Sequence, residues 1–123
     1  ISKEVESAIQ QAVEGTFVRI NEFTVAPQIT PKAGLPYHEW FIEFEKEPED
    51  LEDFASKIDK AMRKQNIYYD DLIVGKVLRE LVITKIKKNG FQNYMKSIGK
   101  LGGQNKIQRL SNDRNLVNLL EKE

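Results

Sequence analysis

The segment Gly99–Arg109 carries the residue types in this sequence that are best suited to binding an anion. Its three glycines allow the backbone to approach a ligand closely, and Lys100, Lys106 and Arg109 supply positive charges that suit phosphate oxygens. A basic, glycine-containing stretch between two helices is also a common form of exposed connection. The segment therefore indicates anion binding without establishing it.

The other candidates for chemistry are one histidine and one acidic pair. The chain has no cysteine, so disulfides, thiolate catalysis and zinc sites of the Cys/His type are excluded. His38 falls on the same strand face as Trp40 and Ile42, which favours a hydrogen-bonded structural histidine over a general base. Asp70 and Asp71 diverge as neighbours and have no suitably spaced third carboxylate, so we expect a solvated turn and no metal site.

The composition is that of one globular domain spanning residues 1–123. The chain is 40% hydrophobic and 31% charged, and it has no apolar run near the roughly 18 residues that a membrane span needs. We therefore expect a cytoplasmic protein with no membrane partner. The net charge is zero, but residues 43–71 hold ten acidic and five basic side chains, whereas 76–109 hold nine basic and one acidic. One end of the domain should attract anions, although no nucleic-acid-binding motif is present.

Hydrophobic periodicity and cap residues predict an α+β fold. The expected elements are a helix from Ser2 to Gly15, strands over 16–26 and 37–45, a helix from Pro48, a short helical turn within 66–76, a strand over 80–87, a helix from Asn89 to Gly99, and a last helix capped by Asn112 and Asp113. The sheet should be small and mixed, with about three strands: an antiparallel hairpin plus a third strand. Helices should cover it, in the order helix-strand-strand-helix-strand-helix-loop-helix.

The strand over 37–45 has the clearest pattern. His38, Trp40, Ile42 and Phe44 alternate with acidic residues at a period of two. We expect Trp40 to lie in the core and this strand to pair antiparallel with the first one. The opposite row, formed by Glu39, Glu43 and Glu45, is expected to be a solvated sheet face.

Three runs of residues resemble one known family. They are Gly102–Asp113 (GGQNKIQRLSND), Asn89-Gly90-Phe91 before a helix, and Tyr37-His38-Glu39-Trp40 at the start of a strand. Together they are similar to the C-terminal domain of the auxin-responsive Gretchen Hagen family of acyl-acid amido synthetases, and within it to bacterial members. This family belongs to the adenylate-forming superfamily that includes firefly luciferase. Nearly the whole chain aligns, with a departure at Gln108, where proline is expected.

The resemblance implies an acid-amine ligase for the full-length protein. Such an enzyme uses ATP to activate a small carboxylic acid as an acyl-adenylate and transfers the acyl group to an amine, usually an amino acid. ATP and Mg would be held mainly by an N-terminal adenylation domain of the same chain, over which this domain closes as a lid. The resemblance implies a catalytic role for Lys106 and nucleotide or phosphate binding by Gln104, Arg109, Gly102 and Gly103.

Two functional classes remain open from the sequence. The first is the lid of an ATP-dependent ligase; the second is a stand-alone α+β binding module for an anionic ligand or RNA. Because the chain starts at Ile1 rather than at methionine, we expect an excised piece. The resemblance implies that this piece is inactive alone and holds no cofactor itself. The sequence identifies neither the acid nor the amine, and Lys106 could act in adenylation or in amide formation.

Overall fold

The computed structural model describes residues 2–100, 102 and 105–123 of the chain. Three strands form a mixed sheet in the order β1-β2-β3. β1 (Arg19–Gln28) and β2 (Tyr37–Lys46) form an antiparallel hairpin, and β3 (Val82–Lys85) runs parallel to β2. A parallel pair needs a crossover, which α2 (Leu51–Gln65) and α3 (Ile67–Val74) provide. The α+β class and the mixed three-stranded sheet are as predicted.

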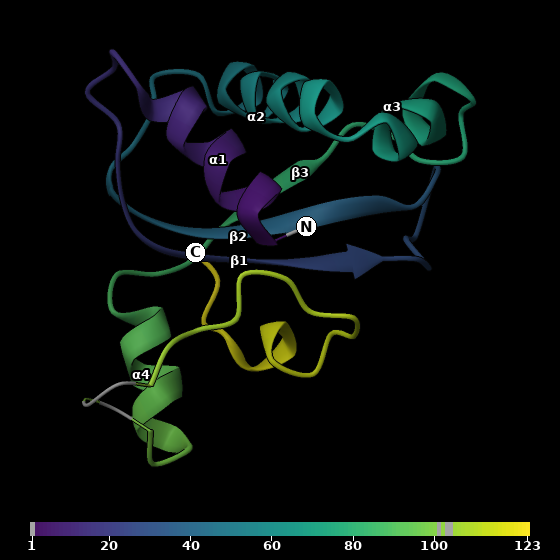
Figure 1. The fold of residues 1–123 in the computed structure, drawn as a ribbon. Helices are drawn as coiled ribbons and strands as arrows, with labels where there is room; N and C mark the ends of the chain where they lie inside the picture. The colour runs from purple at the N-terminus through teal and green to yellow at the C-terminus, as the bar shows by residue number, and fades with distance from the viewer. Residues whose placement is uncertain (1, 101, 103–104) are drawn as a thin grey trace.

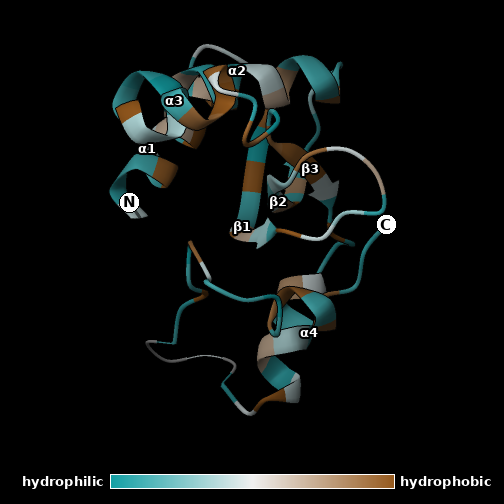
Figure 2. Cartoon of the chain, turned by 90° about the vertical axis from the view of Figure 1, so that its right-hand side faces the viewer, coloured by the Kyte–Doolittle hydropathy of each residue, from teal (hydrophilic) through white to brown (hydrophobic). Residues whose placement is uncertain are grey.

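Both faces of the sheet are covered (Figures 1 and 2). The helix α1 (Ser2–Val13) lies with α2 and α3 on one face, while α4 (Gly90–Ser97) and the C-terminal segment lie on the other. Each face of the sheet has its own hydrophobic core, and successive side chains of β2 point into one core and then the other. Trp40 and Ile42 pack under α1 and α2, whereas Phe41 packs with Ile86 and Phe91. The predicted burial of Trp40 and the predicted hairpin are confirmed.

The prediction that Glu39, Glu43 and Glu45 form a solvated sheet face is wrong, because α4 and the C-terminal segment cover that face. Glu43 is buried, and Glu39 pairs with Arg114 at 2.9 Å and accepts a hydrogen bond from Thr84; only Glu45 is exposed as expected. Local alternation could not show this, because the covering segments follow β2 by more than forty residues. A strand with both faces covered loses the simple alternation of buried and exposed positions.

The prediction of a last helix after Asn112 and Asp113 is also wrong, because the helical segment there is much shorter than expected. Only a 3₁₀ turn, Val117–Leu119, forms there. The Asp113 side chain accepts from the backbone N–H of Asn115, which closes a turn, and the chain then pairs with the outer edge of β3 through Lys122 and Ile86. Pairing at the sheet edge ends the helix early. The expected short helical turn after α2 is confirmed as the eight-residue helix α3.

The C-terminal segment closes both edges of the sheet. Leu110 bridges to Val25 on the outer edge of β1, and Lys122 bridges to Ile86 just beyond β3. Each edge of the sheet is thereby paired at one position, which limits pairing with other chains there. Within the described residues, no helix is long and apolar enough to cross a membrane.

Candidate functional site

The basic loop leaves α4 and returns to the sheet at a buried residue. Gly99 ends α4 in the left-handed conformation (φ 72°), and the N–H of Lys100 donates to the Met95 carbonyl at 2.8 Å. Gly102 is also left-handed (φ 84°), as glycine permits, and Ile107 is buried in the second core. The loop therefore has two fixed ends. Two of the candidate positions, Gly103 and Gln104, lie outside the described residues.

The first anchor of the loop is Glu43 of β2, whose side chain lies at the N-terminus of α4. The cap residue Asn89 makes no side-chain cap bond, and its own backbone is left-handed (φ 67°). Instead, Glu43 reaches across from β2 and accepts from the backbone N–H groups of Asn89 (3.2 Å) and Phe91 (3.4 Å), and from the Asn21 side chain (3.2 Å). A carboxylate at this end complements the helix dipole. Glu43 thus fixes α4 to the sheet.

The second anchor joins the end of the loop to β1. The N–H of Val25 donates to the Arg109 carbonyl and the N–H of Ser111 donates to the Val25 carbonyl, both at 2.9 Å. The Thr24 hydroxyl donates to the Gln108 carbonyl at 2.6 Å. These bonds hold residues 108–111 alongside β1, with one parallel bridge between Leu110 and Val25. The segment therefore has a defined path at Gln108, where the resemblance led us to expect proline.

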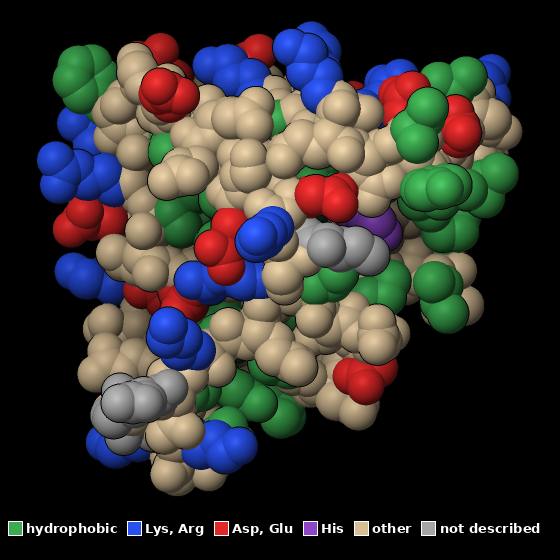
Figure 3. Space-filling model, in the orientation of Figure 1, with side chains coloured by type: hydrophobic (Ala, Val, Ile, Leu, Met, Phe, Trp, Pro, Cys, Tyr) green, Lys and Arg blue, Asp and Glu red, His purple; other side chains and the backbone are tan. Residues whose placement is uncertain are grey.

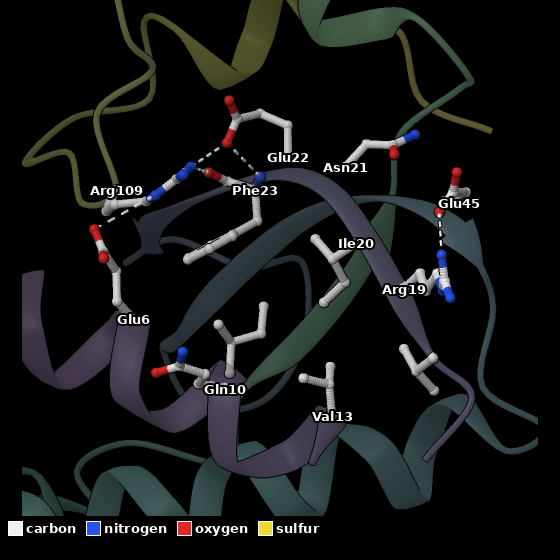
Figure 4. A pocket seen from close by; sticks show the side chains of 12 residues that line it. Glu6, Gln10, Val13, Arg19, Ile20, Asn21, Glu22, Phe23, Glu45 and Arg109 are labelled. Atoms are coloured by element: carbon white, nitrogen blue, oxygen red, sulfur yellow. Dashed lines mark hydrogen bonds and ion pairs between the residues drawn. The ribbon is translucent and has the colours of Figure 1, made fainter. Parts of the chain in front are cut away.

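Arg109 is held by several groups of the protein (Figure 4). Its Nη1 donates to the Glu22 carboxylate and to the Phe23 carbonyl (2.8 Å), and its Nε lies 3.7 Å from a Glu6 oxygen. The guanidinium also lies over the Phe23 ring, 4.3 Å from the centroid. Binding of a phosphate by Arg109 would require exchange of these carboxylate contacts. Its predicted supporting role stays a prediction.

Lys106 has a different environment. It is exposed, and no ion pair involving it occurs among the described residues. In Figure 3, Lys and Arg side chains are spread along the left side of the molecule, and several of them lie at the lower left end that carries α4. The structure therefore places two of the predicted cations in unlike settings, with Lys106 open to an incoming anion and Arg109 bound to the sheet edge.

A groove of about 500 Å³ adjoins Arg109, between α1 and the first half of β1 (Figure 4). Its walls include Ile9, Val13 and Ile20, and its rim includes Glu6 and Glu22. The β1–β2 pairing is irregular next to it, with register shifts between Arg19 and Glu22. Such bulges change the direction in which neighbouring side chains point, and the residues at these shifts line the groove.

His38 lies apart from the candidate loop site. Its ring stacks on Tyr69 at a centroid distance of 5.2 Å, and no hydrogen bond to its side chain occurs among the described residues. Desolvation lowers the His38 pKa below its ordinary value, against a smaller opposing effect of Asp59. Desolvation by burial, together with the hydrogen bond that its hydroxyl donates to Asp59 at 2.5 Å, raises the Tyr69 pKa. His38 therefore stacks on Tyr69 in place of the expected hydrogen bond, and its structural role stays a prediction.

The acidic pair does not form the centre of a metal cluster. No group of three His, Asp or Glu side chains that could hold a metal ion occurs within 2–100, 102 and 105–123. Asp70, one member of the pair, lies in α3 rather than in a turn and is bound to Arg63 of α2 at 2.5 Å.

The fold matches solved structures of acyl acid amido synthetases. One is described as GH3.15 acyl acid amido synthetase (TM-score 0.73, 16% identity, covering 95% of this chain and 23% of that chain). Another is described as AtGH3.15 acyl acid amido synthetase in complex with 2,4-DB (TM-score 0.70, 14% identity, covering 98% of this chain and 25% of that chain). At these identities the matches show the fold, which corresponds to about a quarter of each of those proteins.

The family follows from the sequence match. Residues 3–115 match the family model described as GH3 family C-terminal domain. This chain belongs to that family, the Gretchen Hagen family to which the sequence motifs pointed. No curated protein compared with the chain matches it.

Proposed function

We propose that this chain is the C-terminal lid, excised as a single domain, of an ATP-dependent acyl-acid amido synthetase. The observation that carries the proposal is the setting of Lys106. It is an exposed cation on a loop whose two ends are fixed by Glu43 at α4 and by the β1 pairing of residues 108–111. A charge delivered by a well-anchored loop can meet phosphate oxygens when a lid closes. Family membership supports the same role.

In this proposal Lys106 stabilises the negative charge that develops as ATP and a carboxylic acid react. Positive charge placed where charge develops lowers the barrier to reaction, and closure would exclude water from the reacting groups. Gln104 and Arg109 would support it, and Gly102 and Gly103 would let the backbone approach the nucleotide. Arg109 would first exchange Glu22 and Glu6 for the incoming anion.

The remaining partners belong to the longer protein. We propose that its N-terminal adenylation domain holds ATP and Mg, as membership of the family suggests. The substrates would be a small carboxylic acid and an amine, of which an amino acid is the expected kind. We further propose a cytoplasmic enzyme of the bacterial type, as the loop motif suggested.

The test is Lys106→Ala in the full-length protein, with adenylation followed by ATP-pyrophosphate exchange. We expect the rate to fall by a factor of about 100, with little change in the KM for ATP, because loss of one charge-stabilising group mainly affects the transition state. Lys100→Ala, another exposed lysine of the same loop, is the matched control and should lower the rate far less. Normal adenylation with impaired amide formation would assign Lys106 to the second half-reaction, and normal rates of both would refute its role.

A second measurement tests the lid assignment itself. The 123-residue chain alone should support no ATP-pyrophosphate exchange with any of a panel of carboxylic acids, because the nucleotide and acyl sites would lie in the other domain. Sustained exchange above that of a Lys106→Ala control would contradict this. Tight, salt-dependent RNA binding by the same chain would instead support the stand-alone binding module.

A further inference from the structure

Helix α3 is apolar in composition but largely exposed. Of its eight residues only Tyr69 is buried, whereas Ile67, Tyr68 and Val74 are 68%, 79% and 65% exposed. Residues four apart lie on one face of a helix, so Tyr68 and Leu72 form one exposed row, and Ile67, the exposed Asp71 and Val74 form the next. Two aspartates accompany the apolar residues of this helix, and Asp70 is paired with Arg63. Apolar side chains of a helix normally face a core, but the described residues leave these ones uncovered.

The exposed row belongs to a rigid surface. Tyr69 donates to buried Asp59 and Asp70 binds Arg63, which fixes the inner side of α3 against α2. After the helix, the N–H groups of residues 77 and 78 both donate to the Leu72 carbonyl, at 2.9 and 3.1 Å. This turn holds Val77, another exposed apolar side chain, close to Leu72. In Figure 3, hydrophobic side chains gather at the right of the face, over the position of α3.

A cavity of about 290 Å³ opens beside this surface. Tyr68 and Leu72 of α3 form part of its wall, with Leu110 from the C-terminal segment, Pro27 from β1 and His38 from β2. Desolvation lowers the pKa of His38 below its ordinary value, which disfavours a charged ring at the cavity wall. The polar side chains of Asn66, Ser111 and Asn112 also line it. The cavity suits an aliphatic or aromatic side chain of a protein partner.

We propose that the exposed face of α3 (Ile67, Tyr68, Leu72 and Val74), with Val77 and the adjoining cavity, is the surface on which this domain docks against the large adenylation domain of the same protein. The inference rests on the proposed function. The occupant is chosen because this chain corresponds to only 23–25% of the matched synthetases, so most of such a protein is available to cover the face. Exposed apolar patches of this kind mark protein contacts.

The geometry allows this surface to be tested separately from the loop. In Figure 1, α3 lies at the upper right of the molecule and α4 lies at the lower left. Tyr68 and Leu72 share the cavity with Leu110 and Ser111, next to the second anchor of the loop, whereas Val74 does not line it. A substitution at Val74 therefore leaves the anchors of the loop in place. Leu119, in the 3₁₀ turn, is a matched control because it is 66% exposed here, almost the same as Val74 at 65%.

The experiment compares thiol labelling of Val74→Cys and Leu119→Cys in the full-length protein, with each modified peptide followed by mass spectrometry. If α3 is docked, a thiol at position 74 reacts only when the domains separate, and its labelling should be at least about tenfold slower than at position 119. Equal labelling of the two positions would overturn the proposal. Protection that increases with protein concentration would also overturn it, in favour of a second copy of the chain.

A second variant distinguishes the two proposals. Val74→Asp in the full-length protein should lower ATP-dependent amide formation at least about tenfold by placing a charge in an apolar contact, whereas Leu119→Asp should not. Equal activity of both variants would count against docking through α3. If the unaltered protein forms no amide while position 74 remains protected, the proposed function fails and the docking surface stands.

Discussion

Replacing Glu43 with alanine should destabilise the domain far more than its place in a row of alternating glutamates suggests. The buried carboxylate accepts three hydrogen bonds, two of them from backbone N–H groups at the start of α4. Asn89, which supplies one of these groups, is exposed, so water can replace the lost bond there. Phe91 is only 3% exposed, so its N–H would stay without a partner.

These contacts set the size of the effect. Loss of a helix cap costs about 1 kcal/mol, and leaving one buried donor unsatisfied costs about 1–3 kcal/mol. We therefore expect Glu43→Ala to lower the free energy of unfolding by about 2–4 kcal/mol. Glu43→Gln keeps one acceptor oxygen and should lose roughly half as much.

Urea unfolding followed by Trp40 fluorescence gives the measurement. Trp40 is the only tryptophan of the chain and is 1% exposed, so its emission reports loss of the core. The control is Glu45→Ala, an exposed glutamate on the same strand, which should change stability by no more than about 0.5 kcal/mol. If the two alanine variants unfold at the same urea concentration, Glu43 does not anchor α4 in the way its contacts indicate.

Two further perturbations follow from buried groups. Desolvation lowers the His38 pKa below its ordinary value of 6.5, so the folded protein binds fewer protons than the unfolded chain just below that pH. The free energy of unfolding should therefore fall as the pH drops below about 6.5. Urea midpoints measured between about pH 7.5 and 5 test this. Gly90→Ala would place a Cβ 2.5 Å from Ile86 Cγ2, and because Ile86 is buried, we expect a loss of about 1–3 kcal/mol despite the better helix propensity of alanine.

The predictions for His38 and Gly90 each have a control variant. His38→Gln should flatten the pH dependence in that range, and an unchanged slope would show that another group is responsible. Gln92→Ala, at an exposed position of the same helix as Gly90, should change stability by no more than about 0.5 kcal/mol. A Gly90→Ala protein as stable as the parent would mean that Ile86 can move aside.

The sequence was most informative where short-range pattern and final contacts agree. The strand around Trp40 shows a period of two, and its pairing with β1 and the burial of Trp40 follow. The pattern failed at Glu43, because charge and alternation both suggested solvent. The groups that bury this carboxylate come from Asn89 and Phe91, more than forty residues later, and local periodicity does not encode them.

The candidate site was likewise predictable from the sequence only in part. The loop composition singled out Lys106 and Arg109, and their exposure differs for reasons that spacing cannot show. Glu22 and Glu6, which hold Arg109, are 87 and 103 residues away in the sequence, so only the tertiary fold brings them together. Glu43 offered one weak signal in the sequence, as an acidic residue amid Phe41, Ile42 and Phe44.

The pairing of the last residues with both sheet edges has a consequence for synthesis on the ribosome. Val25 gains its outer partner, Leu110, 85 positions later, and Ile86 pairs with Lys122, the penultimate residue of the chain described here. The helices above the sheet can assemble from residues that emerge early, but neither edge of the sheet can be closed until these final residues emerge. Until then, the strand edges are open to pairing with other chains, and contacts this distant in sequence also form slowly.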